Sequence, residues 1–164
     1  MNASLNELSP KLKNTSSGFT LIELMVTIAV LAIIAGIAAP NISTQLADQR
    51  VKSTAATFTN ALKEAKVESV VRRQNIRVVY NNTAKTIALQ NTSGTVLATY
   101  NVNSKSTVSI TPNTTTTVTF QPDKTTSNGT NVTYVICDSN SATTSRNIIV
   151  STIASVSNKL GGIC

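Results

Sequence analysis

The most constraining feature of this sequence is an apolar run from Phe19 to Ala39 that contains one charged residue, Glu23. At 1.5 Å per residue, a helix of this length is about 31 Å long, which is enough to cross the hydrocarbon core of a bilayer. The residues before the run are polar, and Lys11 and Lys13 favour a cytoplasmic N-terminus. The run therefore predicts a membrane anchor, with the remainder of the chain exported.

Two simpler interpretations of this run leave something unexplained. An ordinary secretory signal has a shorter apolar region that ends in an A-x-A type site, which Gly36–Pro40 matches poorly. A plain anchor has the right length, but it does not explain a carboxylate whose insertion into a membrane costs on the order of a few kcal/mol. Cleavage between Gly18 and Phe19 would create a partner, because the new amine of Phe19 could pair with Glu23 of a neighbouring subunit. Their attraction would be about 4 kcal/mol at an effective dielectric of 20.

The segment around Glu23 resembles a known processing motif. Its residues, Gly-Phe-Thr-Leu-Ile-Glu-Leu from Gly18 to Leu24, are similar to the class III leader of type IV pilins and type II secretion pseudopilins. The resemblance implies that a prepilin peptidase removes residues 1–18 and methylates the amine of Phe19, and that Glu23 serves assembly. It also implies that residues 19–40 form a transmembrane helix that later joins the filament core. Pro40 stands where many pilins have a proline, and we expect a kink there because proline lacks an N–H and clashes with the preceding turn.

The chain after Pro40 changes from helical to strand patterns. Residues 41–75 are expected to form an amphipathic helix, because apolar or small residues recur on one face at Val51, Ala55, Phe58, Leu62, Ala65 and Ser69. Residues 76–164 are expected to form a β-rich head, with runs rich in Val, Ile and Thr. These runs are Ile76–Tyr80, Thr86–Gln90, Val96–Val102, Thr107–Ile110, Thr116–Gln121, Val132–Asp138 and Asn147–Val156. The predicted fold class is α+β, a long N-terminal helix packed on an antiparallel β domain.

The composition argues against an enzyme. The sequence has no His, so it lacks the usual acid/base group that titrates near neutral pH, and histidine-containing triads and zinc sites are excluded. The seven Asp and Glu residues are scattered along the chain. We therefore expect no catalytic, cofactor-binding or metal-ligating residues.

The two cysteines, Cys137 and Cys164, have neither the CxxC spacing nor a nearby His of a metal or redox site. In an oxidising compartment they are expected to form a structural disulfide, which stabilises by roughly 3–4 kcal/mol in the chain-entropy model. In a reducing compartment they would remain free thiols. Export of the head favours the disulfide.

The order of elements also resembles one pilin branch, the minor subunits FimT and FimU and the related pseudopilin GspH. The segments Tyr134–Asp138 and Ser145–Ser151 are similar to the C-terminal strands of that branch, and a terminal Cys paired with a strand Cys fits it. The resemblance implies a minor pilin that helps to initiate pilus assembly at or near the tip. Its expected partners are the prepilin peptidase, other minor and major pilins, the inner-membrane assembly platform and the lipid bilayer. A GspH-like pseudopilin of a type II secretion system is the alternative.

DNA uptake is a further alternative, because some FimT-type subunits bind DNA. The basic Gly-Arg-x-Arg turn associated with that activity is absent after Ser151, where only Lys159 is basic. Arg72, Arg73 and Arg77 form the densest basic group, but they also suit a solvated helix end. These four residues are the candidate DNA contacts, and DNA is not the favoured partner because phosphate binding needs several clustered cations.

Overall fold

The computed structural model describes residues 18–113, 117–139 and 143–164, with only the backbone described at 38–41. The chain divides into two compact units, Met1–Ala39 and Pro40–Cys164, which are considered separately. The expected leader, apart from Gly18, lies outside the described residues. Helix α1 (Leu21–Arg72) supplies the described helical part of both units.

The end of α1 is set by a change of backbone conformation at Arg73. This residue has a φ of 52°, in the left-handed region. Its N–H donates to Val70 O at 3.4 Å, and Gln74 N–H donates to Ser69 O at 3.2 Å. This is the Schellman arrangement, which satisfies carbonyls that the helix leaves unpaired. The helix therefore ends at Arg72, three residues before the predicted boundary at residue 75.

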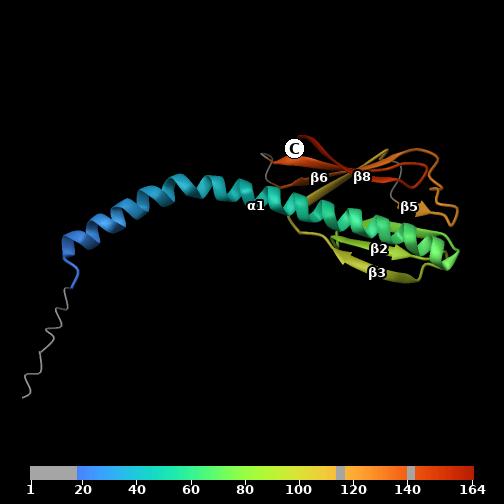
Figure 1. Ribbon diagram of the computed structural model, residues 1–164, viewed down its shortest axis with the longest axis horizontal. Coiled ribbons are helices and arrows are strands. Elements are labelled where there is room, and N and C mark those ends of the chain that lie inside the picture. Colours follow the sequence, from blue (N-terminus) through green and yellow to red (C-terminus); the bar gives the residue numbers. More distant parts are fainter. Residues whose placement is uncertain (1–17, 114–116, 140–142) are drawn as a thin grey trace, which may run out of the picture. The chain divides into compact units, whose positions relative to one another are not determined.

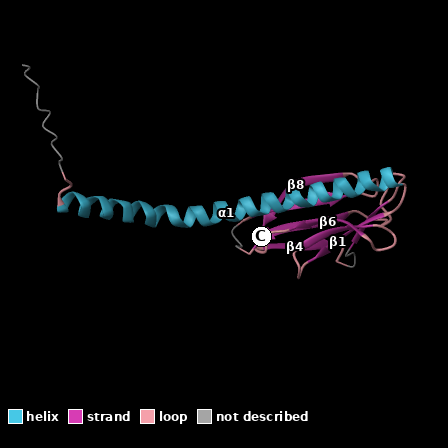
Figure 2. Ribbon diagram, turned by 90° about the horizontal axis from the view of Figure 1, so that it is seen from below, coloured by secondary structure: helices cyan, strands magenta, loops and turns pink. Residues whose placement is uncertain are grey.

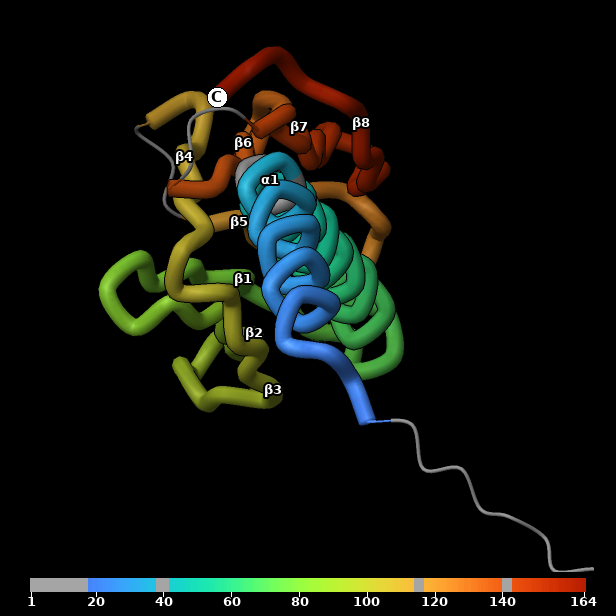
Figure 3. Tube along the Cα trace, turned by 90° about the vertical axis from the view of Figure 1, so that its left-hand side faces the viewer, coloured from blue at the N-terminus to red at the C-terminus, as the bar shows by residue number. Residues whose placement is uncertain are grey.

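The second unit contains two antiparallel four-stranded sheets, in the orders β3-β2-β1-β5 and β4-β6-β7-β8. In Figure 1, β2 and β3 lie on one side of α1 and β6 and β8 on the other, and Figure 3 shows the head from the end of the helix. Figure 2 shows the same head with its strands beside α1. The strands are β1 (Ile76–Asn81), β2 (Thr86–Gln90), β3 (Val96–Asn101), β4 (Ser106–Thr111), β5 (Thr117–Phe120), β6 (Val132–Asp138), β7 (Thr144–Val150) and β8 (Val156–Ile163). The α+β prediction is confirmed.

One core joins α1 to both sheets. The predicted helical stripe is fully buried, and Phe58 stacks obliquely between Tyr80 of β1 and Tyr134 of β6, with centroid distances of 5.3 and 5.2 Å. Each such aromatic pair contributes about 0.5–1.5 kcal/mol beyond its buried area. The other large buried side chains include Leu62, Ile76, Ile87, Leu89, Phe120, Ile136 and Ile148.

The last predicted strand, Asn147–Val156, is wrong. The structure ends β7 at Val150 and begins β8 at Val156, with a tight turn between them. Ala154 has a φ of 52°, and its N–H donates to Ser151 O at 2.9 Å. The turn was missed because it contains no Gly, Pro, Asn or Asp to mark it.

Candidate functional site

The N-terminal segment begins α1 with a threonine cap. Glu23 N–H donates to Thr20 Oγ1 at 3.2 Å, and Leu24 N–H donates to Thr20 O at 3.2 Å. Thr20 and Glu23 also have the Thr-x-x-Glu spacing of a capping box, a signal that was present in the sequence and that the prediction overlooked. The helix therefore begins inside this motif, directly after Thr20.

Glu23 lies in the first turn of α1, where the exposed N–H groups favour a negative charge. Within the described residues of this chain, it forms no salt bridge. The side chain of Phe19 is 83% exposed. The geometry therefore leaves both the Glu23 carboxylate and Phe19 accessible to another molecule.

The apolar side chains of the first unit are exposed wherever the structure describes them. Every side chain from Gly18 to Ile37 is exposed, including Leu21 at 77% and Ile37 at 70%. A helix that is apolar on all sides is stable only where lipid or protein covers it. Among the described residues, no single helix is long and apolar enough to cross a membrane, whereas the pair Leu21–Ile37 and Ile42–Arg72 together meets the length and composition required.

The kink expected at Pro40 falls on the boundary between the two units, which are described separately. It stays a prediction.

The two cysteines are joined. Cys137, on β6, forms a disulfide with Cys164, and their Cα atoms are 5.8 Å apart. The backbone N–H of Cys164 also donates to Thr143 O at 3.0 Å. These contacts hold the end of β8 against the middle of its sheet.

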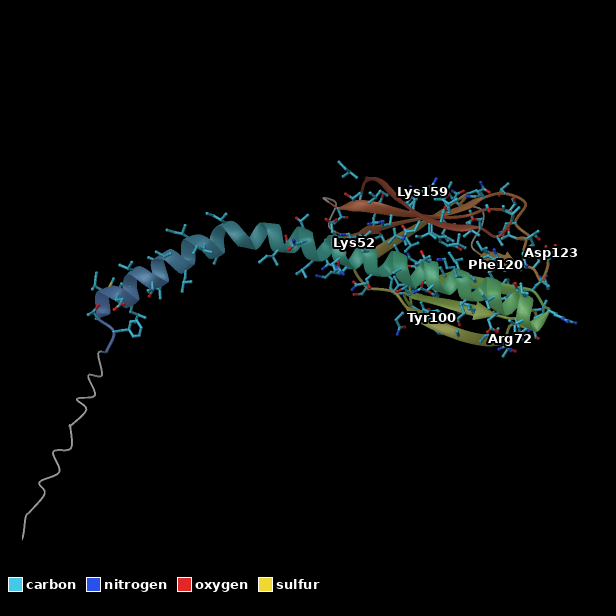
Figure 4. All side chains as sticks on the ribbon, in the orientation of Figure 1. Lys52, Arg72, Tyr100, Phe120, Asp123 and Lys159 are labelled. Carbon is cyan, nitrogen blue, oxygen red and sulfur yellow. A yellow bond between two sulfur atoms is a disulfide. The ribbon has the colours of Figure 1, made fainter. Side chains whose placement is uncertain are left out.

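The four candidate DNA contacts do not form one surface. Arg72 pairs with Glu68 at the end of α1, Arg73 follows it, and Arg77 lies on β1. Lys159 lies on β8, the outer strand of the other sheet, and Figure 4 shows it well apart from Arg72. The structure therefore leaves Lys159 apart from the end of α1.

Two protein-family models match this chain, one in each unit. Residues 13–39 match the prokaryotic N-terminal methylation motif, and residues 54–154 match the type II transport protein GspH family. The chain belongs to the GspH family. The methylation motif implies processing by a prepilin peptidase and assembly with other pilins.

Solved structures support the GspH-family fold. The type IV minor pilin FimU of Pseudomonas aeruginosa is 19% identical in two crystal forms, with TM-scores of 0.59 and 0.61. These matches cover 69% and 71% of this chain and 98% and 96% of the FimU chains. The minor pseudopilin EpsH from the type 2 secretion system of Vibrio cholerae is 9% identical with a TM-score of 0.54, covering 68% of this chain and 97% of EpsH. No significant match to a curated protein was found.

This GspH-family chain is a structural subunit and not an enzyme, since the families that it matches are pilins and pilin-like proteins. The apolar N-terminal helix of this subunit suggests membrane anchoring.

Proposed function

We propose that this chain is a minor type IV pilin that helps to initiate pilus assembly at or near the tip. A prepilin peptidase cuts between Gly18 and Phe19 and methylates the Phe19 amine. Residues 19–40 then hold the subunit in the inner membrane, with the N-terminus cytoplasmic and the head periplasmic. At the assembly platform this helix leaves the lipid and joins other minor and major pilins.

The observation that carries this proposal is the exposed apolar helix with an acid in its first turn. Its side chains from Gly18 to Ile37 have no cover within the chain, so their stable environments are a bilayer and a bundle of similar helices. In a bundle, Glu23 pairs with the Phe19 amine of the adjacent subunit. That attraction of about 4 kcal/mol at an effective dielectric of 20 sets the axial register between subunits.

The test compares Glu23→Ala with a matched variant, Thr27→Val. Thr27 lies one turn further along α1, and its Oγ1 donates to Leu24 O at 2.8 Å, so its loss removes a polar group without a charge. We expect Glu23→Ala to reach the membrane and to be cleaved, but to be depleted from sheared pili, whereas Thr27→Val is incorporated normally. Mass spectrometry of the incorporated protein should show a methylated Phe19 at its N-terminus. Normal incorporation of Glu23→Ala, or pili that retain residues 1–18, would contradict the proposal.

A second candidate is a GspH-like pseudopilin of a type II secretion system. The match to the GspH family over residues 54–154 favours it directly. A strain in which the gene for this chain is deleted distinguishes the two roles. Loss of surface pili with normal protein secretion supports the pilin, and the reverse supports the pseudopilin. A role in DNA uptake is not proposed, because Lys159 lies apart from Arg72, so the candidate cations do not form the cluster that phosphate binding needs.

A further inference from the structure

Three cations gather at the C-terminal end of α1. Arg73 directly follows the helix, Arg77 lies on β1, and Lys124 lies in the loop after β5. This loop is tied to the helix, because Ser69 Oγ donates to Gln121 O at 3.2 Å. The antiparallel pairing of β1 with β5 places Arg77 opposite Thr119. Residues far apart in the sequence are therefore assembled at one end of the head.

Two of these cations occupy backbone conformations that favour glycine. Arg73 has a φ of 52° and Lys124 a φ of 66°. A side chain in this region carries a conformational cost, which glycine would avoid. The helix cap fixes the backbone of Arg73, and a turn in which Lys124 N–H donates to Gln121 O at 3.1 Å fixes that of Lys124.

The neighbouring acids offset only part of this positive charge, because Asp123 contributes one negative charge next to Lys124. Glu68 forms a salt bridge with Arg72. Asp123 accepts hydrogen bonds from the Thr125 hydroxyl at 2.6 Å and the Thr125 N–H at 3.0 Å, and the hydroxyl bond is the main cause of its lowered pKa. Within the described residues, Arg73, Arg77 and Lys124 form no salt bridge. The surface keeps a local excess of positive charge.

A pocket of about 130 Å³ lies at Arg77, and we call it the Arg77 pocket. Its lining residues all have polar side chains and are Asn75, Arg77, Asn91, Thr92 and Thr119. Asn91 is held in place, because its Oδ1 accepts the Thr95 N–H at 2.8 Å. An arginine fork binds a carboxylate through two parallel hydrogen bonds, and amides and hydroxyls are suited to the hydroxyl groups of a sugar.

We propose that the Arg77 pocket binds a carboxylated sugar unit of an acidic polysaccharide, with Arg73 and Lys124 contacting acidic groups of adjacent units. This binding activity goes beyond the proposed role in pilus assembly. A polysaccharide fits better than a single-stranded nucleic acid, because no aromatic residue lines the pocket to stack with bases. It also fits better than duplex DNA, because three cations provide few phosphate contacts.

The test measures binding of the full chain, in a non-ionic detergent, to immobilised polygalacturonate at physiological ionic strength. Neutral dextran and a DNA duplex are the comparison ligands. We expect saturable binding to polygalacturonate, none to dextran, and weaker binding to DNA. Arg77→Gln should weaken the binding at least about tenfold, as expected for loss of a charged hydrogen bond. Arg73→Gly and Lys124→Gly should each weaken it about threefold.

The glycine variants separate function from structure. They remove a cation while relieving the backbone, so they should bind less tightly and yet melt no earlier than the unchanged protein. Lys159→Gln is the matched control, since it removes the same charge from the other sheet, and its affinity should not change. Absence of binding to polygalacturonate, equal binding to DNA, or an equal loss in Lys159→Gln would each overturn the proposal.

Discussion

Arg50 and Asp138 form a two-pronged ion pair between α1 and β6. Arg50 Nε lies 2.8 Å from Asp138 Oδ2, and Arg50 Nη2 lies 3.0 Å from Asp138 Oδ1. The side chain of Asp138 is fully buried and that of Arg50 is 24% exposed. The hydrogen bond to Asp138 raises the pKa of Arg50, so the guanidinium stays charged. Because Asp138 directly follows Cys137, this pair and the disulfide secure the same end of β6.

Removing one member of this pair should be far more harmful than replacing both. Arg50→Met takes the guanidinium away from the buried Asp138 carboxylate, and we expect the free energy of unfolding to fall by about 1.5–3 kcal/mol, as for a lost hydrogen bond to a charged group. The double variant Arg50→Met/Asp138→Leu removes both charges and should recover most of that loss. Urea unfolding of the two single variants and the double variant measures the coupling. Additive losses in the double variant would show that the pair does not act as a unit.

Ionisation of Tyr100 should lower the free energy of unfolding at alkaline pH. Its hydroxyl donates to the Glu64 carboxylate, and this hydrogen bond raises the pKa of Tyr100 to about 12. The unfolded tyrosine ionises near a pH of about 10. The raised folded pKa means that the stabilisation is fully present below about pH 10 and is lost as the pH rises through about 12. The free energy of unfolding should therefore fall over this window, and the fall should be smaller in Tyr100→Phe.

Glu64→Gln provides the control for this titration. It keeps the tyrosine but removes the negative charge, so the Tyr100 pKa should move back toward about 10. The ultraviolet absorbance of tyrosinate in the folded protein reports the change directly. Burial also raises the pKa of Tyr80 and of Tyr134, so their titration should be unaffected by Glu64→Gln. An unchanged Tyr100 titration in this variant would mean that Glu64 does not control its pKa.

Arg73 should be replaceable by glycine with a gain in stability. The left-handed φ of 52° carries a strain that glycine does not, so Arg73→Gly should raise the free energy of unfolding by about 1 kcal/mol. Arg73→Ala removes the same charge but keeps a Cβ, and we expect a change within about 0.5 kcal/mol. Thermal and urea unfolding of the two variants gives the difference. Equal stabilities would show that the charge and not the backbone decides the effect.

The local patterns in the sequence predicted the elements better than their assembly. The stripe from Val51 to Ser69 is buried as expected, because helical periodicity depends only on neighbours along the chain. The division of the strands into two sheets was not predicted, because it depends on pairings between distant segments. The same holds for Arg50 and Asp138, which are 88 residues apart. In the N-terminal segment, the acid at Glu23 was recognised, but the cap at Thr20 was overlooked although its spacing was visible.

The two adjacent glycines of β8 should respond very differently to substitution. β8 departs from regular pairing with β7 between Thr144 and Arg146, and Gly161 lies against β7 there. A Cβ at Gly161 would collide with Ser145 Oγ and lie 2.8 Å from Asn147 Oδ1, whereas a Cβ at Gly162 would meet nothing within 4 Å. Ser145 cannot easily move away, because its hydroxyl donates to Gly162 O at 2.9 Å. We therefore expect Gly161→Ala to lower the free energy of unfolding by about 1–3 kcal/mol.

Gly162→Ala is the matched control for that substitution. It adds the same methyl group one residue along the strand, and its free energy of unfolding should stay within about 0.5 kcal/mol of the unchanged protein. Urea unfolding under oxidising conditions keeps the Cys137–Cys164 disulfide intact in both variants, so that the comparison concerns only the added methyl group. Equal effects of the two substitutions would mean that the close approach of Gly161 to Ser145 does not constrain the strand, and that β8 is held by its disulfide and its hydrogen bonds instead.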